Sequence, residues 1–322
     1  MKKTLTTVLL LCILTCASAQ DGKTKDVNRF SPKAGSLSLG LSIDPLAATA
    51  FNFQPGNGDF LGEYISAIAA NPQQMFLISP NSAVAIRMKY YTGEKFALKF
   101  SLGFTGSCSS YKEYVSDDYA TKVVDPASQD VVTDVLKSNL GGASLTVGFE
   151  SIFGSRSVRF TIGASVGYAL GGGRLTMNYG NPIALYNGYN PTVMPNCSRV
   201  ADGSAQGPLN NISKAEVERM GYVNARPISR YNMGICQSLG LFADMGIEWF
   251  CVDRMSIGAQ LSILPLCVYF QPQTHSEYEG FSNRTGNVEK YTKMVSPGST
   301  SFSYGLGLNN LGLKLSVNYY LF

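Results

Sequence analysis

The sequence predicts an all-β protein, a transmembrane antiparallel β-barrel of about eight strands, or ten if one turn lies near the C-terminus. The main observation is a strict alternation: the Phe96–Phe104 segment places Phe, Leu, Phe, Leu and Phe on one face and Ala, Lys, Ser and Gly on the other. This pattern returns about eight times behind a predicted export signal. A barrel wall in lipid needs an apolar outer face and tolerates a polar interior, so repeated alternation of this kind favours a membrane barrel.

The N-terminus has the features of a cleaved signal peptide. Lys2 and Lys3 precede an apolar run from Val8 to Leu14, and Ala17-Ser18-Ala19 forms a small-residue cleavage site. We therefore expect three parts: residues 1–19 as signal peptide, 20–32 as a short periplasmic segment, and 33–322 as the barrel domain. Removal of the signal lowers the formal charge from +4 to +2, which argues against nucleic acid as a partner.

Eight strands are predicted from the alternation. In order, they cover about Ala34–Ile43, Ala83–Tyr91, Lys95–Ser107, Leu140–Ser151, Val158–Leu170, Cys236–Trp249, Met255–Tyr269 and Ser301–Phe322. Asn309-Asn310 in the last segment predicts either a β-bulge that resets the register or a hairpin turn, and the turn would change the strand count.

The predicted connections alternate between short and long. The short ones are residues 92–94, 152–157 and 250–254, and the long ones are roughly 44–82, 108–139, 171–235 and 270–300. Short periplasmic turns and long outer loops are typical of bacterial outer-membrane barrels. A soluble β-sandwich has no reason to alternate its loop lengths in this way.

The predicted inward face is rich in glycine and carries charges of both signs. Small inward residues suit a narrow barrel, whose interior is filled by side chains. Buried charges persist when they are paired, so we expect a lumen closed by ion pairs rather than a wide pore. The predicted lumen charge network consists of Arg87, Lys89, Lys99, Glu150, Arg159, Asp244, Glu248 and Lys314.

The long loops contain apolar residues at helical spacing, which predicts short helices in an ordered outer cap. Ser213 is a predicted cap ahead of Val217 and Met220, and Ser128 is a predicted cap ahead of Val131 to Leu136. Asp59 is a third predicted cap. The face that follows Asp59 either packs within the cap or forms a partner-binding surface, and its residues are Phe60, Tyr64, Ile65 and Ile68.

The chain has few residues suited to metal binding or catalysis. Its cysteines form no CxxC unit, so no metal or cofactor is expected. Cys108, Cys197 and Cys236 fall on the outer side of the predicted topology, where one pair could form a disulfide or all three could stay unpaired. The only histidine, His275, is predicted to be a solvated loop residue rather than a catalytic one.

The export signal, the amphipathic strands, the outer loops and the terminal Phe322 resemble the small bacterial outer-membrane barrels of the OmpA/OmpX type. The resemblance implies an integral outer-membrane location, contact with outer-membrane lipid, and insertion by the barrel-assembly machinery. We expect the chain to lack the peptidoglycan-binding domain of the two-domain members.

The function expected from the sequence is non-catalytic. We expect a structural or protein-binding component at the cell surface, which could be a subunit of a larger assembly with another outer-membrane protein. A narrow passive channel for small solutes is the alternative, and a lipid-modifying enzyme that depends on His275 is a weaker one.

Overall fold

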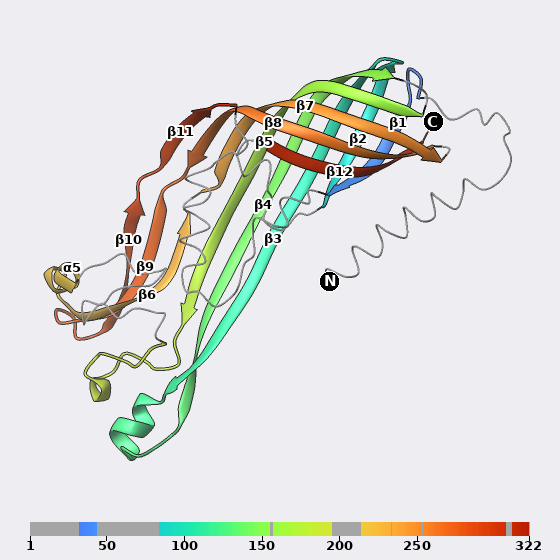
Figure 1. Ribbon diagram of the computed structural model, residues 1–322. Helices are drawn as coiled ribbons and strands as arrows, with labels where there is room; N and C mark the ends of the chain where they lie inside the picture. Colours follow the sequence, from blue (N-terminus) through green and yellow to red (C-terminus); the bar gives the residue numbers. More distant parts are fainter. Residues whose placement is uncertain are drawn as a thin grey trace.

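The computed structural model describes residues 32–43, 84–154, 157–194, 214–232, 234–252, 254–306 and 311–321. Strands dominate these residues (Figure 1). The strands are β1 (Leu37–Ile43), β2 (Val84–Gly93), β3 (Phe96–Ser116), β4 (Val131–Gly154), β5 (Val158–Asn178), β6 (Tyr222–Asn232), β7 (Cys236–Val252), β8 (Met255–Gln271), β9 (Thr274–Ser282), β10 (Val288–Ser296), β11 (Ser299–Tyr304) and β12 (Leu311–Tyr320). The helical segments are η1 (Ala120–Val124), η2 (Leu185–Asn187) and α5 (Lys214–Arg219). Among the described residues, no helix is long and apolar enough to cross a membrane.

Eight of the strands close into a ring, so the fold is an antiparallel β-barrel. The ring runs β1-β2-β3-β4-β5-β7-β8-β12 and closes because β12 pairs with β1, with Tyr319 opposite Leu39. Every pairing in the ring is antiparallel. The predicted barrel of eight strands is therefore confirmed.

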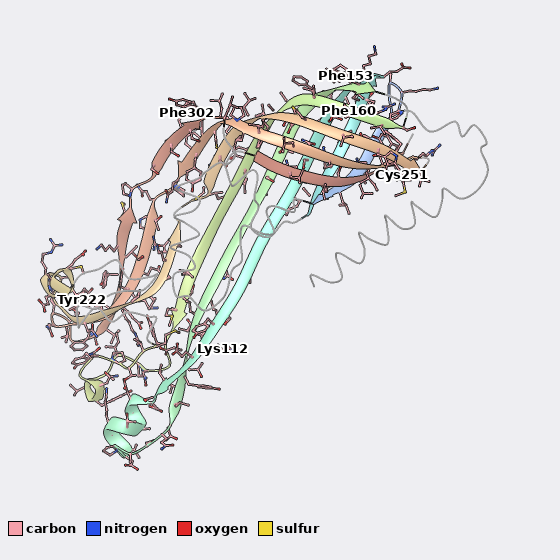
Figure 2. All side chains as sticks on the ribbon, in the orientation of Figure 1. Lys112, Phe153, Phe160, Tyr222, Cys251 and Phe302 are labelled. Atoms are coloured by element: carbon pink, nitrogen blue, oxygen red, sulfur yellow. The ribbon has the colours of Figure 1, made fainter. Side chains whose placement is uncertain are left out.

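The side chains of the ring alternate between an apolar outer face and a buried polar lumen. On β7, burial alternates from Cys236 to Phe250, with leucine, methionine, isoleucine and tryptophan at the exposed positions. Phe160 and Phe302 likewise lie on the outer surface (Figure 2) and are 54% and 62% exposed. At about 3.3 Å per residue and a tilt of about 40°, the segment from Leu239 to Trp249 spans about 25 Å, which matches the apolar band of a membrane barrel.

Three ring strands extend beyond this band and form the base of an outer lobe. β3, β4 and β5 are 21, 24 and 21 residues long, and they stay paired to their ends. The helix predicted after Ser128 is wrong, because Val131 to Leu136 belong to β4. Val131, Val132 and Val135 are β-branched and fit a paired strand better than a short helix.

The outer lobe is a continuation of the barrel wall. β6 pairs with the upper part of β5, β9 pairs with β6, and β10 pairs with β9, which gives a sheet in the order β3-β4-β5-β6-β9-β10 (Figure 1). α5 packs Val217 against Ala225 and Tyr278 of this sheet. A helix is present where the residues after Ser213 predicted one, whereas the predicted helix after Asp59 lies outside the described residues.

The last predicted strand is divided into β11 and β12, which both pair with β8. Tyr304 pairs with Leu266 and Leu311 pairs with Ile263. Six residues lie between Tyr304 and Leu311, whereas only two lie between their partners on β8. The connection from β11 to β12 therefore has extra residues, as a bulge requires. Asn309 and Asn310 themselves lie outside the described residues. β8 has its own irregularity at Pro265, where the β7 register shifts between Leu241 and Ala243. Proline has no N–H to donate to a ladder, which is why it occurs at such bulges.

Candidate functional site

A buried ion-pair cluster lies in the lumen between β2, β4 and β7. The Lys89 Nζ atom is 2.7 Å from Glu150 Oε1 and 3.0 Å from Glu248 Oε2, and all three side chains are almost fully buried. Glu248 also accepts hydrogen bonds from Ser256, Asn318 and Tyr320. The two carboxylates share one ammonium group, and the neutral donors stabilise the second negative charge.

A second polar cluster surrounds Asp244 one step further along the lumen. Lys99 Nζ lies 2.5 Å from Asp244 Oδ2, and Ser165 donates to the same oxygen at 2.7 Å. Gln260 and Ser262 donate to the other oxygen at 2.8 and 2.5 Å. The carboxylate therefore has four donors around it, a number that fully satisfies its two oxygens.

The remaining predicted lumen charges have partners of other kinds. Arg87 donates to the Gln260 side chain at 2.5 Å instead of to a carboxylate. The Arg159 guanidinium lies 5.2 Å from the centre of the Phe250 ring, and Lys314 Nζ lies 5.8 Å from the centre of the Phe242 ring. These are cation–π contacts, which contribute to the stabilisation of the two cations.

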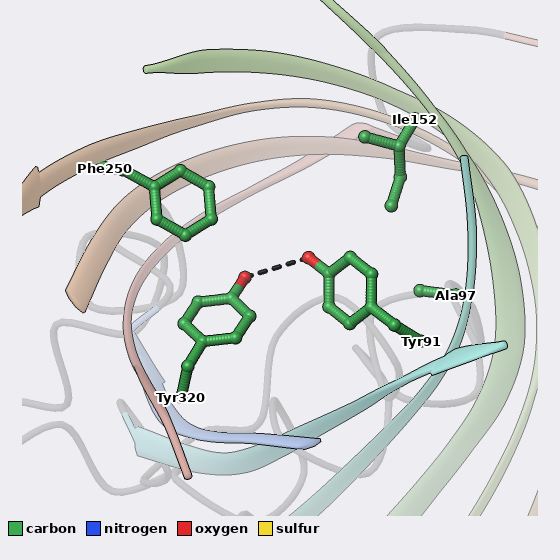
Figure 3. Packing of buried hydrophobic residues seen from close by; sticks show 5 residues of the cluster. All are labelled: Tyr91, Ala97, Ile152, Phe250 and Tyr320. Carbon is green, nitrogen blue, oxygen red and sulfur yellow. Dashed lines mark hydrogen bonds between the residues drawn. The ribbon is translucent and has the colours of Figure 1, made fainter. Parts of the chain in front are cut away.

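An aromatic layer fills the lumen at the end with the short turns. The Tyr91 and Tyr320 hydroxyl groups are 2.9 Å apart, and both side chains point into the enclosed space with Phe250 and Ile152 (Figure 3). Tyr91, Phe250 and Tyr320 are at most 2% exposed. The tyrosine pair is joined to the ion-pair cluster, because Tyr320 also donates to Glu248.

An apolar layer fills the lumen on the other side of the charged clusters. Phe242, Leu264 and Cys267 form a buried cluster there. Phe242, Asp244, Glu248 and Phe250 occupy inward positions along a single strand, β7, so the layers follow one another along the lumen. A cavity among Arg87, Glu248 and Gln260 has a volume of about 10 Å³, room for about one water molecule. Aromatic, charged and apolar layers thus follow one another along the lumen in the described residues.

The far end of the outer lobe carries an exposed apolar surface, which we call the tip cluster. It consists of Tyr119, Val123, Val124, Leu185 and Tyr186. Leu185 is 76% exposed and Val124 is 69% exposed. Tyr119 and Tyr186 join η1 to η2 through an edge-to-face contact with ring centres 5.4 Å apart.

A buried hydrogen-bond network holds the tip cluster in place. Asp118 accepts two hydrogen bonds from Thr192, at 2.8 Å from N–H and 2.7 Å from the hydroxyl, and one from Asn187. Burial alone would raise the pKa of the Asp118 carboxyl group. The bonds from Thr192 and the Lys122 ammonium group outweigh burial and hold this pKa below its ordinary value. The ionised carboxylate therefore ties the segment before η1 to the segment after η2.

The remaining candidate site residues are the apolar face after Asp59 and the cysteines. Phe60, Tyr64, Ile65, Ile68 and Cys197 lie outside the described residues. Cys108 is exposed on β3 and Cys236 is buried on β7, and the described cysteines form no disulfide with each other. Within the described part of the chain, no group of three or more histidine, cysteine or acidic side chains is placed to hold a metal ion.

His275 does not lie in a solvated loop, and this expectation is wrong. It belongs to β9, is 9% exposed, and stacks on Tyr231 with ring centres 6.0 Å apart. Its position was missed because β9 has the sequence Thr-His-Ser-Glu-Tyr-Glu-Gly-Phe-Ser, in which polar residues occupy both faces. Such a strand has no apolar alternation to reveal it.

Neutral side chains that were not predicted as site residues complete the lumen. The lumen network was predicted from charged residues alone, so it did not include uncharged donors. Three such donors occupy inward positions: Ser165, Gln260 and Ser262. Phe242 and Leu264 did carry a signal, since a large apolar residue on the small-residue face indicates a filled lumen.

No family model matches the chain, and no curated protein matches it in sequence. Solved structures that match the chain include the outer membrane protein OprG from Pseudomonas aeruginosa, with 10% identity over 88% of this chain and 96% of that chain, and a TM-score of 0.26. Another is a major outer membrane protein from Thermus thermophilus, with 11% identity over 89% of this chain and 100% of that chain, and a TM-score of 0.29. The β-barrel assignment rests on the closed ring of eight antiparallel strands and not on these matches.

Proposed function

We propose that this protein is a non-catalytic component of the bacterial outer membrane, in which a closed barrel anchors a rigid outer lobe that binds a protein partner through the tip cluster. The observation that carries this proposal is the tip cluster itself. Valine, leucine and tyrosine side chains are exposed there on a scaffold fixed by the buried Asp118 carboxylate. Contiguous exposed apolar surface on an ordered scaffold is typical of an interaction site.

The charges around the tip cluster define the chemistry of the partner. Asp117, Asp125 and Asp130 flank η1 in the sequence, and Lys122 is the cation of η1, where it pairs with the buried Asp118. A surface with an apolar centre and an acidic rim complements a partner with an apolar centre and a basic rim. The same acidic rim disfavours anionic lipid headgroups as the occupant.

Two other functions have weaker support. A passive channel needs a continuous lumen, and the aromatic, charged and apolar layers of the lumen argue against one. A lipid-modifying enzyme would need an accessible general base, and His275 is buried in β9 against Tyr231.

The proposal is tested by recovering the tagged protein from gently solubilised outer membranes, with Val124→Glu/Leu185→Glu as the test variant. We expect a partner in stoichiometric amount with the unmodified protein, and loss of that partner from the double variant. Met294→Glu is the matched control, because Met294 is also exposed but lies opposite His275, at the end of β10 that is remote from Phe281 and Tyr189. Recovery of the unmodified protein without a partner, or a partner retained by the double variant, would contradict the proposal.

A further inference from the structure

A groove opens on the outer lobe where β5 and β6 separate. The two strands pair only from Arg174 to Thr176, with Tyr231 and Ser229 as the partners at the ends. Beyond Thr176 the space between them holds about 490 Å³ and is lined from β5, β6, β9 and β10. This volume lies within the range of about 300–1,000 Å³ that is usual for small-ligand sites.

The groove has three cations and two carboxylates. Arg226 already has partners within the protein. It lies 2.8 Å from Glu279, donates to the Asn181 carbonyl, and lies over the ring of Tyr179. Arg174 meets Glu277 only at 3.5 Å, and in the described residues Lys290 forms no ion pair. The net charge of the lining is therefore +1, so one negative charge on a ligand would neutralise it.

Arg174 lines the groove and is largely exposed. Its side chain is 55% exposed, and its guanidinium lies 5.6 Å from the centre of the Tyr231 ring. The cation–π contact holds the guanidinium beside the groove, and its exposure leaves donors available to a ligand. A guanidinium suits a carboxylate, which binds its fork of donors through two parallel hydrogen bonds.

The rest of the lining combines neutral donors with available acceptors. Thr176 and Asn178 offer a hydroxyl and an amide, and Asn178 is exposed. Glu277 accepts a hydrogen bond from Ser229 at 2.5 Å, which leaves other lone pairs of its carboxylate for a ligand hydroxyl. Ile228 and Pro182 supply a small apolar surface. A ligand with many hydroxyl groups meets both the donors and the acceptors of this lining.

We propose that this groove binds an acidic saccharide, with its carboxylate on Arg174 and its hydroxyl groups on Thr176, Asn178 and Glu277, while Lys290 adds a further positive charge to the lining. An acidic peptide carries its charge on a chain with few hydroxyl groups, so it would leave these neutral groups unused. The site is separate from the tip cluster, and its occupancy does not depend on a protein partner.

The test uses cellobiouronate as the probe and cellobiose as the neutral control, since the two differ only in that a carboxylate replaces one hydroxymethyl group. Binding is measured by calorimetry on the full-length protein in lipid nanodiscs. A charge-assisted hydrogen bond predicts about tenfold tighter binding of cellobiouronate than of cellobiose. Arg174→Gln and Lys290→Gln should each reduce this preference, whereas Lys95→Gln, at an exposed turn at the other end of the barrel, should leave it intact.

Three results would overturn the proposal. The first is equal binding of the two sugars, and the second is an unchanged preference in both groove variants. The third is tighter binding of the peptide Gly-Glu-Gly amide than of cellobiouronate. Each variant is first compared with the unmodified protein in its circular dichroism spectrum and its unfolding midpoint, so that loss of binding is measured on folded protein. Two separate groove variants keep the test decisive if one of them fails to fold.

Discussion

The Lys89 ammonium group lies 3.0 Å from the Glu248 carboxylate, although their strands are four places apart in a ring of eight. β2 and β7 are thus on opposite sides of the barrel, and one pair of side chains spans the full width of the lumen. A barrel of eight strands is just narrow enough for this contact. The lumen is therefore a packed core, and its ion pairs join opposite walls.

Replacing Lys89 with methionine should destabilise the barrel strongly. The substitution leaves Glu150 and Glu248 buried without their shared cation, and breaking a buried pair in this way costs about 3–5 kcal/mol. The measurement is urea unfolding of the protein in lipid vesicles. Lys95→Met, at an exposed turn, is the control and should change the unfolding free energy by less than about 0.5 kcal/mol. Equal stabilities of the two variants would show that the Lys89 cluster does not support the fold.

The unmodified protein should not conduct ions like a general porin in planar bilayers. Phe242→Ala should also stay closed, because the Lys99–Asp244 and Lys89–Glu248 clusters block the lumen independently of the apolar layer. A general porin reconstituted in the same bilayers is the positive control. Large, steady conductance steps from the unmodified protein would contradict the closed lumen.

Gly163→Ala should impair folding because there is no space for a Cβ atom at this position. An added Cβ would collide with the Phe149 carbonyl oxygen and would lie 2.9 Å from the Glu150 Cα atom. Backbone atoms of a paired strand cannot move aside easily, so the expected loss is about 1–3 kcal/mol or more. Gly93→Ala is the matched control, since a Cβ there would meet nothing within 4 Å. Heat-modifiable mobility on gels and urea midpoints measure the difference.

The ring strands could be predicted from sequence because lipid and lumen impose opposite demands on alternate residues. The same argument predicted that inward charges would be buried, and residues such as Lys99 and Asp244 do meet across the lumen. The partner of each charge depends on how neighbouring strands are shifted relative to one another. The alternation within one strand gives no information about this shift. This is why Arg87 meets Gln260 rather than an acid.

The outer lobe was harder to predict because water, not lipid, surrounds it. β9 and β10 need no apolar face toward a membrane, and β6 contains Pro227, which argues against a strand in a sequence reading. In the lobe, strands form because β5 offers a free edge above the barrel, and a single sequence does not reveal that edge. The groove between β5 and β6 was unpredictable for the same reason.

The last prediction concerns the pH dependence of the tip cluster. The folded-state pKa of Asp118 lies below its ordinary value of 3.8, so the ionised carboxylate stabilises the folded tip. A depressed pKa of an acid gives stability that is fully present above the unfolded-state pKa. That stability is lost as the pH falls through the lower, folded-state pKa. The segments that Asp118 joins should therefore loosen only under strongly acidic conditions.

Hydrogen exchange of residues 117–124 and 181–192 measures this effect, with rates corrected for the intrinsic exchange at each pH. At about pH 6, Asp118→Asn should reduce protection of both segments by about 1.5–3 kcal/mol, because hydrogen bonds to a charged group are lost. The difference from the unmodified protein should shrink as the pH falls below 3.8. Asp130→Asn changes an exposed acid of the same loop and should leave protection unchanged at every pH. A difference that persists at low pH would mean that Asp118 acts through its shape and not through its charge.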